Sequence, residues 1–197
     1  MHIVTLPEPL QQFALDLSHL LDTETAEPVF LPGVGELMRG LVARDDWLPT
    51  ACAKNHPDYY QQYLLYADPF DRFSVVSFVW GPGQHTPIHD HTVWGVIGVL
   101  RGAECAQGFA IGPDGKAEPT GEEVELRPGD IAFVSPTVGD VHRVRNAYDD
   151  RVSISIHAYG GNIGRIRRHV FPPEGGASKE FVSGYSNAAE LDRPAGD

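Results

Sequence analysis

The apolar positions in the first third of the chain repeat with the period of an α-helix. Between residues 9 and 22 their spacing lines one helical face, at Leu10, Phe13, Ala14, Leu17, Leu20 and Leu21. After a break at Pro32-Gly33, the pattern predicts a second helix around 35–43 and a short third helix over 59–66. We therefore expect residues 1–66 to form a helical N-terminal part.

The pattern changes at Phe73, where short runs rich in β-branched and aromatic residues begin. These runs are FSVVSFVW, VWGVIGVL, IAFV and RVSISIHAY, and turn sequences such as GPG, GPDG and RPGD separate them. No helical pattern lies between them, so they predict antiparallel strands in a sandwich or small barrel whose interior can hold one ligand site. We expect a single domain over 1–197, with this β region over 67–175 and a tail over 176–197 that frays near 193–197.

An excess of acidic residues argues against nucleic acids and membranes as partners. The 197 residues include 27 acidic and 15 basic side chains, and the formal net charge of -12 repels phosphate backbones and anionic lipids. The N-terminal sequence has no basic region followed by a long apolar stretch. With only two cysteines, Cys52 and Cys105, the sequence predicts no disulfide framework. We expect a cytoplasmic protein that binds small molecules.

Three histidines supply the first candidate chemistry. His89 and His91, in the string HDH, lie two residues apart. On an extended strand both imidazoles therefore face one side and can reach one ion at the ~2.0–2.1 Å of a metal–nitrogen bond. His142 follows a turn and can complete the set from a neighbouring strand, with Asp90 or main-chain carbonyls fixing the imidazole orientation. Alternatively, HxH is a polar strand edge and His142 an ordinary surface residue.

A second set of polar residues lies in the string SISIHAY. Ser155, His157 and Tyr159 alternate with apolar residues, so they project from one face of a strand. Such a line can pass hydrogen bonds along itself and present the tyrosine hydroxyl to whatever lies at the metal. The alternation also fits a solvated strand face, which antiparallel sheets often have.

The spacing around the histidines resembles the two motifs of the cupin superfamily. The resemblance implies a cupin-type small β-barrel, an antiparallel jelly roll, behind the N-terminal helices. The matching positions are Gly83, His89, His91 and Gly102 and, less tightly, Gly129, Asp130, Pro136, His142 and Asn146. Most cupins have a metal-binding Glu shortly after the second histidine, where this chain has Gly95, and Glu104 lies too far along to replace it. The ligand set is thus three histidines without a carboxylate, which suits a thiolate beside dioxygen but also suits zinc.

Together, the HDH string, the later histidine and the Ser-x-His-x-Tyr string resemble the thiol dioxygenase family over about 60–168. This family contains cysteine dioxygenase and the bacterial 3-mercaptopropionate dioxygenases. The resemblance implies one non-haem Fe(II) per chain, held by His89, His91 and His142. It implies an outer-sphere catalytic triad made of Ser155, His157 and Tyr159. The implied reaction converts a small thiol and O2 to a sulfinic acid.

Two departures from mammalian-type cysteine dioxygenases indicate the substrate. The substrate-binding Arg of their Tyr-x-Arg string is replaced here by Gln62, and their cross-linking Cys is replaced by Gly95. A substrate carboxylate then needs another cation, and Arg168 matches the arginine that serves in the 3-mercaptopropionate branch. We expect Gln62 and Arg168 to bind a short mercapto-carboxylate. Cysteine as the substrate, a zinc or manganese cupin isomerase or hydrolase, and a non-enzymatic metabolite-binding cupin are the alternatives.

Overall fold

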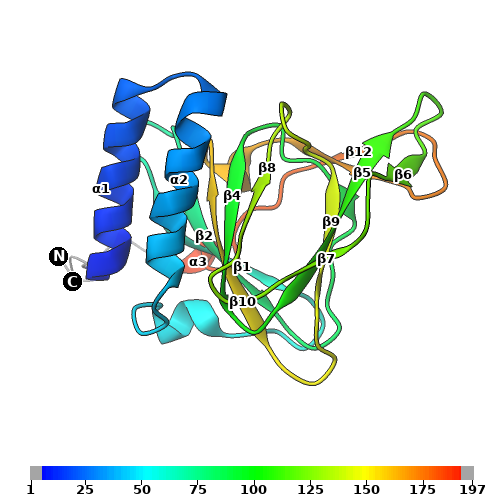
Figure 1. The fold of residues 1–197 in the computed structure, drawn as a ribbon. Helices are drawn as coiled ribbons and strands as arrows, with labels where there is room; N and C mark the ends of the chain where they lie inside the picture. Colours follow the sequence, from blue (N-terminus) through cyan, green and yellow to red (C-terminus); the bar gives the residue numbers. More distant parts are fainter. Residues whose placement is uncertain (1–5, 192–197) are drawn as a thin grey trace.

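Two curled antiparallel β-sheets form the body of the protein, and two helices pack on the outside of one sheet (Figure 1). We describe a computed structural model that places residues 6–191. The α-helices are α1 (Glu8–Thr23), α2 (Glu27–Val42) and α3 (Ala188–Leu191), and the 3-10 turns are η1 (Thr50–Ala53) and η2 (Ile163–Arg165). The mostly β fold expected from the sequence, with curled antiparallel sheets behind N-terminal helices, is confirmed.

The strands of each sheet come from distant parts of the chain. The first sheet has the order β1-β2-β10-β4-β8, with bounds Gln61–Ala67, Ser74–Trp80, Ser153–Tyr159, Gly95–Arg101 and Ile131–Val134. The second has the order β12-β11-β3-β9-β5-β6, with bounds Lys179–Phe181, Arg168–Phe171, Ile88–His89, His142–Asn146, Glu104–Ile111 and Ala117–Pro119. A further strand, β7 (Val124–Leu126), pairs with β5. Because the sheets curl, the inner faces of both enclose one interior.

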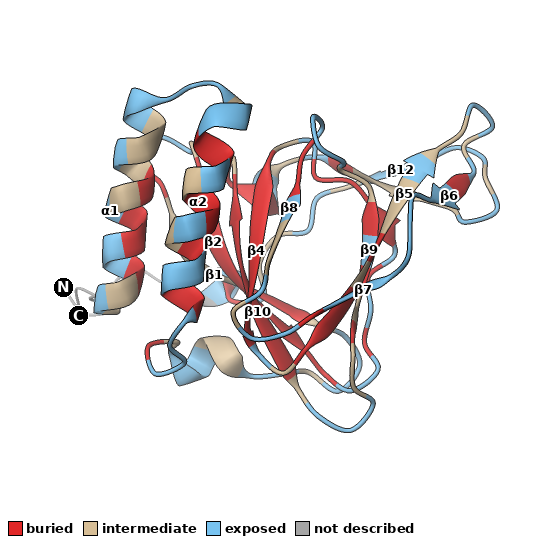
Figure 2. Ribbon diagram, viewed as in Figure 1, coloured by how far each residue is buried: buried red, intermediate tan, exposed pale blue. Residues whose placement is uncertain are grey.

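The central strands of the first sheet are buried on both faces (Figure 2). One face of β10 carries Ile154, Ile156 and Ala158, which join the hydrophobic cluster under the helices. The opposite face looks into the barrel and carries the polar side chains of the SISIHAY string. Strand alternation thus divides one short segment between the core and the candidate site.

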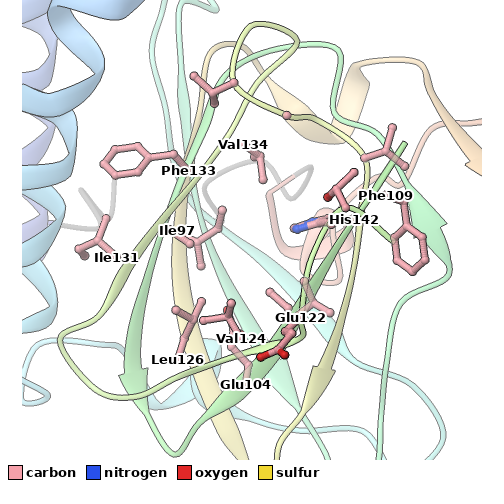
Figure 3. Close-up of a pocket in the computed structure, with 18 residues that line it drawn as sticks. Ile97, Glu104, Phe109, Glu122, Val124, Leu126, Ile131, Phe133, Val134 and His142 are labelled. Carbon is pink, nitrogen blue, oxygen red and sulfur yellow. The ribbon is translucent and has the colours of Figure 1, made fainter. Parts of the chain in front are cut away.

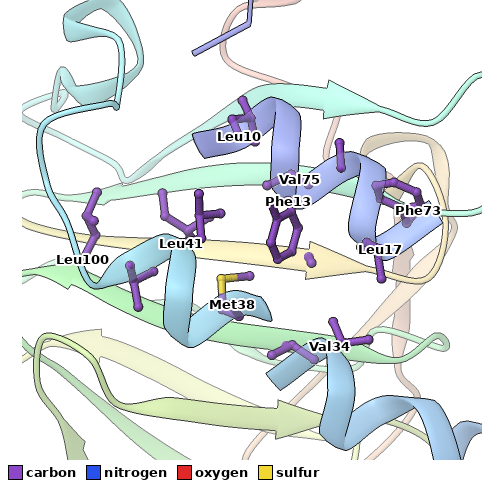
Figure 4. Close-up of a cluster of buried hydrophobic side chains, with 14 of the residues drawn as sticks. Leu10, Phe13, Leu17, Val34, Met38, Leu41, Phe73, Val75 and Leu100 are labelled. Carbon is purple, nitrogen blue, oxygen red and sulfur yellow. The ribbon is translucent and has the colours of Figure 1, made fainter. Parts of the chain in front are cut away.

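The two long helices cover the outer face of the first sheet through their apolar sides (Figure 4). On α1 the buried positions are Leu10, Phe13, Ala14 and Leu17, as the spacing predicts. The helix α2 begins at Glu27 and continues through Pro32, whereas the sequence suggested a break there. Proline removes one helical hydrogen bond, but the apolar face around it, including Val34 and Met38, is fully buried and holds the helix in place.

The expected third helix is wrong: residues 61–67 form the strand β1, which pairs with β2. Tyr60 and Leu64 have helical spacing, but Leu64 lies within a run of aromatic and apolar residues, 63–67, that fits a strand equally well. Pairing with β2, which is entirely buried, decides between the two conformations. The last helical turn of the N-terminal part is therefore η1.

The C-terminal tail expected to be loop contains β12 and α3, and its residues 182–187 run beside β1. Ser186 donates its main-chain N–H to the carbonyl of Gln62 at 2.8 Å, and Asn187 exchanges two 3.0 Å hydrogen bonds with the main chain of Leu64. These bonds satisfy main-chain groups on the outer edge of the first sheet. The fraying predicted for 193–197 lies outside the described residues. Within those residues, no helix is both long and apolar enough to cross a membrane.

Candidate active site

The second sheet brings the three candidate metal ligands together. His89 on β3 lies directly opposite His142 on β9, and His91 follows β3. Their nitrogen ligand atoms all lie within 4.8 Å of one another, and each side chain is buried. A pairing between two strands that are 53 residues apart, from 89 to 142, therefore builds the cluster. Its donors can reach one ion with modest side-chain adjustment.

Burial keeps the imidazoles of His89 and His142 neutral, which is the form that binds metal. Loss of solvent, followed by repulsion from His91, lowers the pKa of His89 to about 3 and lowers that of His142 well below its usual range. His89 donates from Nδ1 to the carbonyl of Pro87 at 3.1 Å, which leaves its Nε2 lone pair for a ligand. The cluster thus fits a divalent metal ion.

Asp140, which the sequence did not single out, orients His91, whereas the expected main-chain carbonyl orients His89. The main-chain carbonyl of Asp140 also lies 3.2 Å from Nδ1 of His91. The Asp140 carboxylate lies 3.1 Å from Nδ1 of His91 and accepts the main-chain N–H groups of His91 and Thr92 at 3.0 and 2.9 Å. Burial raises the pKa of Asp140, but these hydrogen bonds outweigh it and lower the pKa overall. Asp90 instead faces His169, with 2.8 Å between Oδ2 and Nδ1. The position of Asp140 two residues before His142 was the available signal.

The side chains of Ser155, His157 and Tyr159 form a continuous hydrogen-bonded chain inside the barrel. Ser155 Oγ lies 2.8 Å from Nε2 of His157, and Nδ1 of His157 lies 2.8 Å from the Tyr159 hydroxyl. Burial lowers the pKa of His157 and raises that of Tyr159, so both stay neutral near pH 7. The Tyr159 ring stacks on His91 with 5.5 Å between centroids. The chain therefore ends beside the histidine cluster.

Gly95 faces the Tyr159 ring across the β4–β10 pair. A Cβ at this position would lie 2.9 Å from two ring carbons of Tyr159 and 2.8 Å from Val134. Glycine is needed for this close approach, and it offers no sulfur to the ring. A thioether to Tyr159 cannot form from this position.

Arg168 and Gln62 meet through a residue that the sequence did not single out, Ser183. Arg168 donates from Nη2 to Ser183 Oγ at 2.6 Å, and Gln62 donates from Nε2 to the same oxygen at 3.2 Å. The Arg168 side chain is 3% exposed, stacks over Phe181 and is paired with no carboxylate in the described chain. Its Nε has no hydrogen-bond partner among those residues. No local pattern marks Ser183, because its contacts are formed by distant segments.

A cavity of about 530 Å³ opens between β4, β5, β8 and β9 and reaches His142 (Figure 3). Most of its lining is apolar, including Ile97, Leu126 and Val134. Its acidic lining residues are Glu104 and Glu122, and Figure 3 labels both on the same cavity as His142.

A cluster of buried imidazoles enclosed by curled antiparallel sheets is the arrangement of a metal-binding cupin. More particularly, the chain belongs to the cysteine dioxygenase type I family, whose sequence model matches residues 46–170. This is a metal-dependent family of thiol dioxygenases, and the match includes all the candidate ligands.

Individual relatives agree with this family. The chain is 24% identical over 161 residues to cysteine dioxygenase type 1 of Danio rerio, which covers 79% of this chain and 76% of that protein. It is 28% identical over 90 residues to the Rattus norvegicus protein of the same name, covering 45% and 44%. A solved Klebsiella pneumoniae protein with a double-stranded beta-helix domain is 22% identical, with a TM-score of 0.45, covering 57% of this chain and 87% of that one.

Proposed function

We propose that the protein is an Fe(II)-dependent thiol dioxygenase that converts 3-mercaptopropionate and O2 to 3-sulfinopropionate. Family membership supports the reaction class. The observation that carries the substrate assignment is the buried Arg168, which has no acidic partner among the described residues. A desolvated guanidinium needs an anion, and the carboxylate of a small substrate supplies one. An acidic chain with two cysteines suits work in the cytoplasm.

The proposed metal ligands are His89, His91 and His142. Neutral imidazoles leave the ion its full positive charge, so an anionic thiolate is a favourable further ligand. Bound there, Fe(II) would supply the redox chemistry that joins dioxygen to sulfur. The reaction balances without another co-reactant, because RSH and O2 give RSO2H, with sulfur oxidised and both oxygen atoms reduced.

Arg168 would bind the substrate carboxylate, with Ser183 holding the guanidinium in place. Arg168 acts electrostatically on both His89 and Tyr159, so it belongs to the same electrostatic environment as the cluster. Gln62 shares Ser183 with Arg168 and contributes an uncharged amide to this end of the site. A planar guanidinium suits a carboxylate because it can donate two parallel hydrogen bonds.

The absence of an amine favours 3-mercaptopropionate over cysteine. Asp90 is the carboxylate that acts electrostatically on Arg168. It is already occupied by His169, because it accepts the main-chain N–H of that residue and faces its ring. An ammonium group would therefore enter a buried site without an acidic partner, which costs free energy. Tyr159 would keep its proton, because burial raises its pKa, and would orient the substrate or oxygen through its hydroxyl.

Cysteine is the second candidate substrate, because the relatives described above are cysteine dioxygenases. Oxygen uptake by iron-loaded protein, measured with 3-mercaptopropionate, L-cysteine and cysteamine, decides between them. We expect the highest kcat/KM for 3-mercaptopropionate and the lowest for cysteamine, which has no carboxylate. A tenfold advantage for cysteine, about 1.4 kcal/mol, would make the protein a cysteine dioxygenase instead.

The same assay tests the remaining alternatives. Protein loaded with zinc or manganese should not consume oxygen with any of these thiols. If no thiol is oxidised by the iron form either, the dioxygenase proposal is wrong, and a cupin isomerase, hydrolase or metabolite-binding protein takes its place.

A further inference from the structure

A buried carboxyl group lies at the end of the Ser155–His157–Tyr159 chain that is distant from the histidine cluster. Glu104, the first residue of β5, is 2% exposed. The side chains of Ser155 and Trp80 lie next to its carboxyl group and stabilise the charged form. Its Oε2 has no hydrogen-bond partner among the described residues, and no cation pairs with it there. A buried carboxyl that is only partly satisfied is unfavourable unless its proton has a role.

The hydrogen bonds of Ser155 connect this carboxyl group to Tyr159. Trp80 Nε1 donates to Ser155 Oγ at 3.2 Å, and this bond can run in one direction only, because an indole N–H has no acceptor. One lone pair of Oγ is therefore taken. The other lone pair and the hydroxyl proton of Ser155 remain for Glu104 and His157. If one of these two neighbours accepts the hydroxyl proton of Ser155, the other must donate a hydrogen bond to the remaining lone pair of Ser155 Oγ.

An ionised Glu104 fixes the chain in one direction. The carboxylate accepts the hydroxyl proton of Ser155, so Ser155 Oγ accepts from Nε2–H of His157. The neutral ring then has no proton on Nδ1, which accepts from the Tyr159 hydroxyl. In this state the Tyr159 proton points away from the site, and only its oxygen lone pairs face the substrate.

A protonated Glu104 reverses every bond. The carboxylic acid donates to Ser155, Ser155 donates to Nε2 of His157, and Nδ1–H of His157 donates to the Tyr159 oxygen. The Tyr159 proton is then available to the site. Both arrangements use each donor and acceptor of Ser155, so neither leaves an unpaired group in the chain.

We propose that Glu104 is a positioning residue whose proton decides whether Tyr159 donates a hydrogen bond to the active site or to His157. Its catalytic meaning rests on the proposed dioxygenase function, in which the Tyr159 hydroxyl faces the thiol and oxygen. The chain thus has four members rather than three, and its direction is set from the cavity side of the barrel.

The surroundings of Glu104 permit this change near neutral pH. Burial raises its pKa to about 7, although Ser155 and Trp80 partly offset the rise. The titratable side chains on its cavity are His142 on β9 and Glu122 before β7, and those of the adjoining hydrogen-bonded chain are His157 and Tyr159 on β10. Burial holds the pKa of His157 far below this range, so His157 changes tautomer without becoming charged.

The neighbours of Glu104 along the second sheet face away from it. The residue after Glu104 on β5, Cys105, pairs with Glu125 on one side and with Arg145 on the other. Strand alternation points these three side chains to the outer face of the sheet. Ion pairing of Arg145 with Glu123 occurs on that face. The proton on Glu104 is therefore governed by the cavity and the Ser155 chain.

The test is the protonation of His157 in metal-free protein, read by ¹⁵N NMR, which distinguishes Nδ1–H from Nε2–H. The His157 signals are assigned by their loss in a His157→Gln variant. Across a titration from about pH 5 to about pH 9, wild-type protein should change from Nδ1–H to Nε2–H as pH rises. In Glu104→Gln the amide cannot titrate, so the tautomer ratio should be independent of pH. Glu122→Gln, on the same cavity but exposed, should behave as wild type.

Two results would overturn the proposal: a single His157 tautomer throughout the wild-type titration, or an unchanged switch in Glu104→Gln. The first result needs no Glu104 variant, so the proposal can still be contradicted if the Glu104 variant fails to fold. In iron-loaded wild-type protein, kcat should change over the same pH range as the His157 tautomer. This change should disappear in Glu104→Gln and persist in Glu122→Gln. If the NMR behaves as expected but no thiol is oxidised, the proposed function fails while the control of Tyr159 by Glu104 stands.

Discussion

His142 belongs to the strand opposite His89, so its removal leaves the proposed metal only two imidazoles. We predict that His142→Ala loses its iron, because no carboxylate stands in the cluster to replace the missing donor. Metal analysis after buffer exchange measures this, with His85→Ala, an exposed histidine, as the control. One tightly held iron per chain in His142→Ala would show that the ligand set is different.

Arg168 should matter for substrate binding far more than its exposed neighbour Arg167. In Arg168→Ala, KM for 3-mercaptopropionate should rise by an amount equivalent to about 1.5–3 kcal/mol, the value of a hydrogen bond to a charged group. Steady-state oxygen uptake measures the change, and a thermal unfolding curve checks that the variant folds. Arg167→Ala should leave KM within twofold. Equal values for both variants would mean that the carboxylate binds elsewhere.

The glycine opposite Tyr159 leads to a prediction about covalent structure. Because Gly95 offers no sulfur, the protein should keep the mass of its unmodified sequence after many turnovers. Intact-mass measurement of denatured protein tests this. A loss of two hydrogens, located by digestion to a peptide containing Tyr159, would contradict it.

At this scale, local spacing revealed the residues that share a strand, and His142 was expected from a neighbouring strand, but two other residues that meet the site across the fold were missed. Ser155, His157 and Tyr159 were predictable because strand alternation with a period of two puts them on one face. Ser183 and Glu104 were not, because their contacts depend on the pairing of remote segments. Glu104 was considered only as a metal ligand, for which it lies too far along the chain.

Among the elements, α1 shows most directly how an apolar face stabilises the fold. Leu17 is fully buried in the cluster beneath the helix, whereas Leu15 on the same helix is 58% exposed. Leu17→Ala should lower the free energy of unfolding by about 2–5 kcal/mol, from lost transfer energy and the cavity left behind. Leu15→Ala should change it by less than about 0.5 kcal/mol. Urea unfolding of both variants checks the difference, and equal losses would mean that the helix is not docked as described.

The strands show where sequence patterns stop being sufficient. Strand β2 was predictable from a long apolar and β-branched run, because a strand covered on both faces needs apolar residues on both. Strand β10 was predictable from its alternation of apolar and polar residues. The segment that forms β1 carries spacing compatible with a helix, and only its pairing with β2 settles its conformation. The strand β12 is short and mostly exposed, so its pairing with β11 leaves no apolar pattern.

For the whole molecule, buried neutral histidines make stability depend on pH. The pKa of His89 is lowered to about 3, and those of His142 and His157 lie well below the ordinary 6.5. Below 6.5 the unfolded chain binds protons that the folded protein does not. The free energy of unfolding therefore falls as pH falls, by about 1.4 kcal/mol per pH unit for each histidine. Glu104, whose pKa is raised from 4.5 to about 7, has the opposite effect between those values.

The combined effect of three histidines on the free energy of unfolding exceeds the opposite effect of one carboxyl group. Metal-free protein should therefore be less stable at about pH 5 than at about pH 7.5. Urea unfolding with a chelator present measures this. His85→Gln, which changes an exposed histidine, should leave the dependence unaltered. Equal or greater stability at the lower pH would mean that these histidines are not held neutral in the folded protein.

The position of Ser183 has a consequence for the order in which the site is completed during protein synthesis. Its hydrogen bond to Gln62 spans 121 residues, and every proposed metal ligand and member of the Ser–His–Tyr chain precedes it. A growing chain therefore contains all three histidines before the segment that fixes Arg168 has been translated. Nascent protein would acquire the capacity to hold metal first and the capacity to select a carboxylate substrate last.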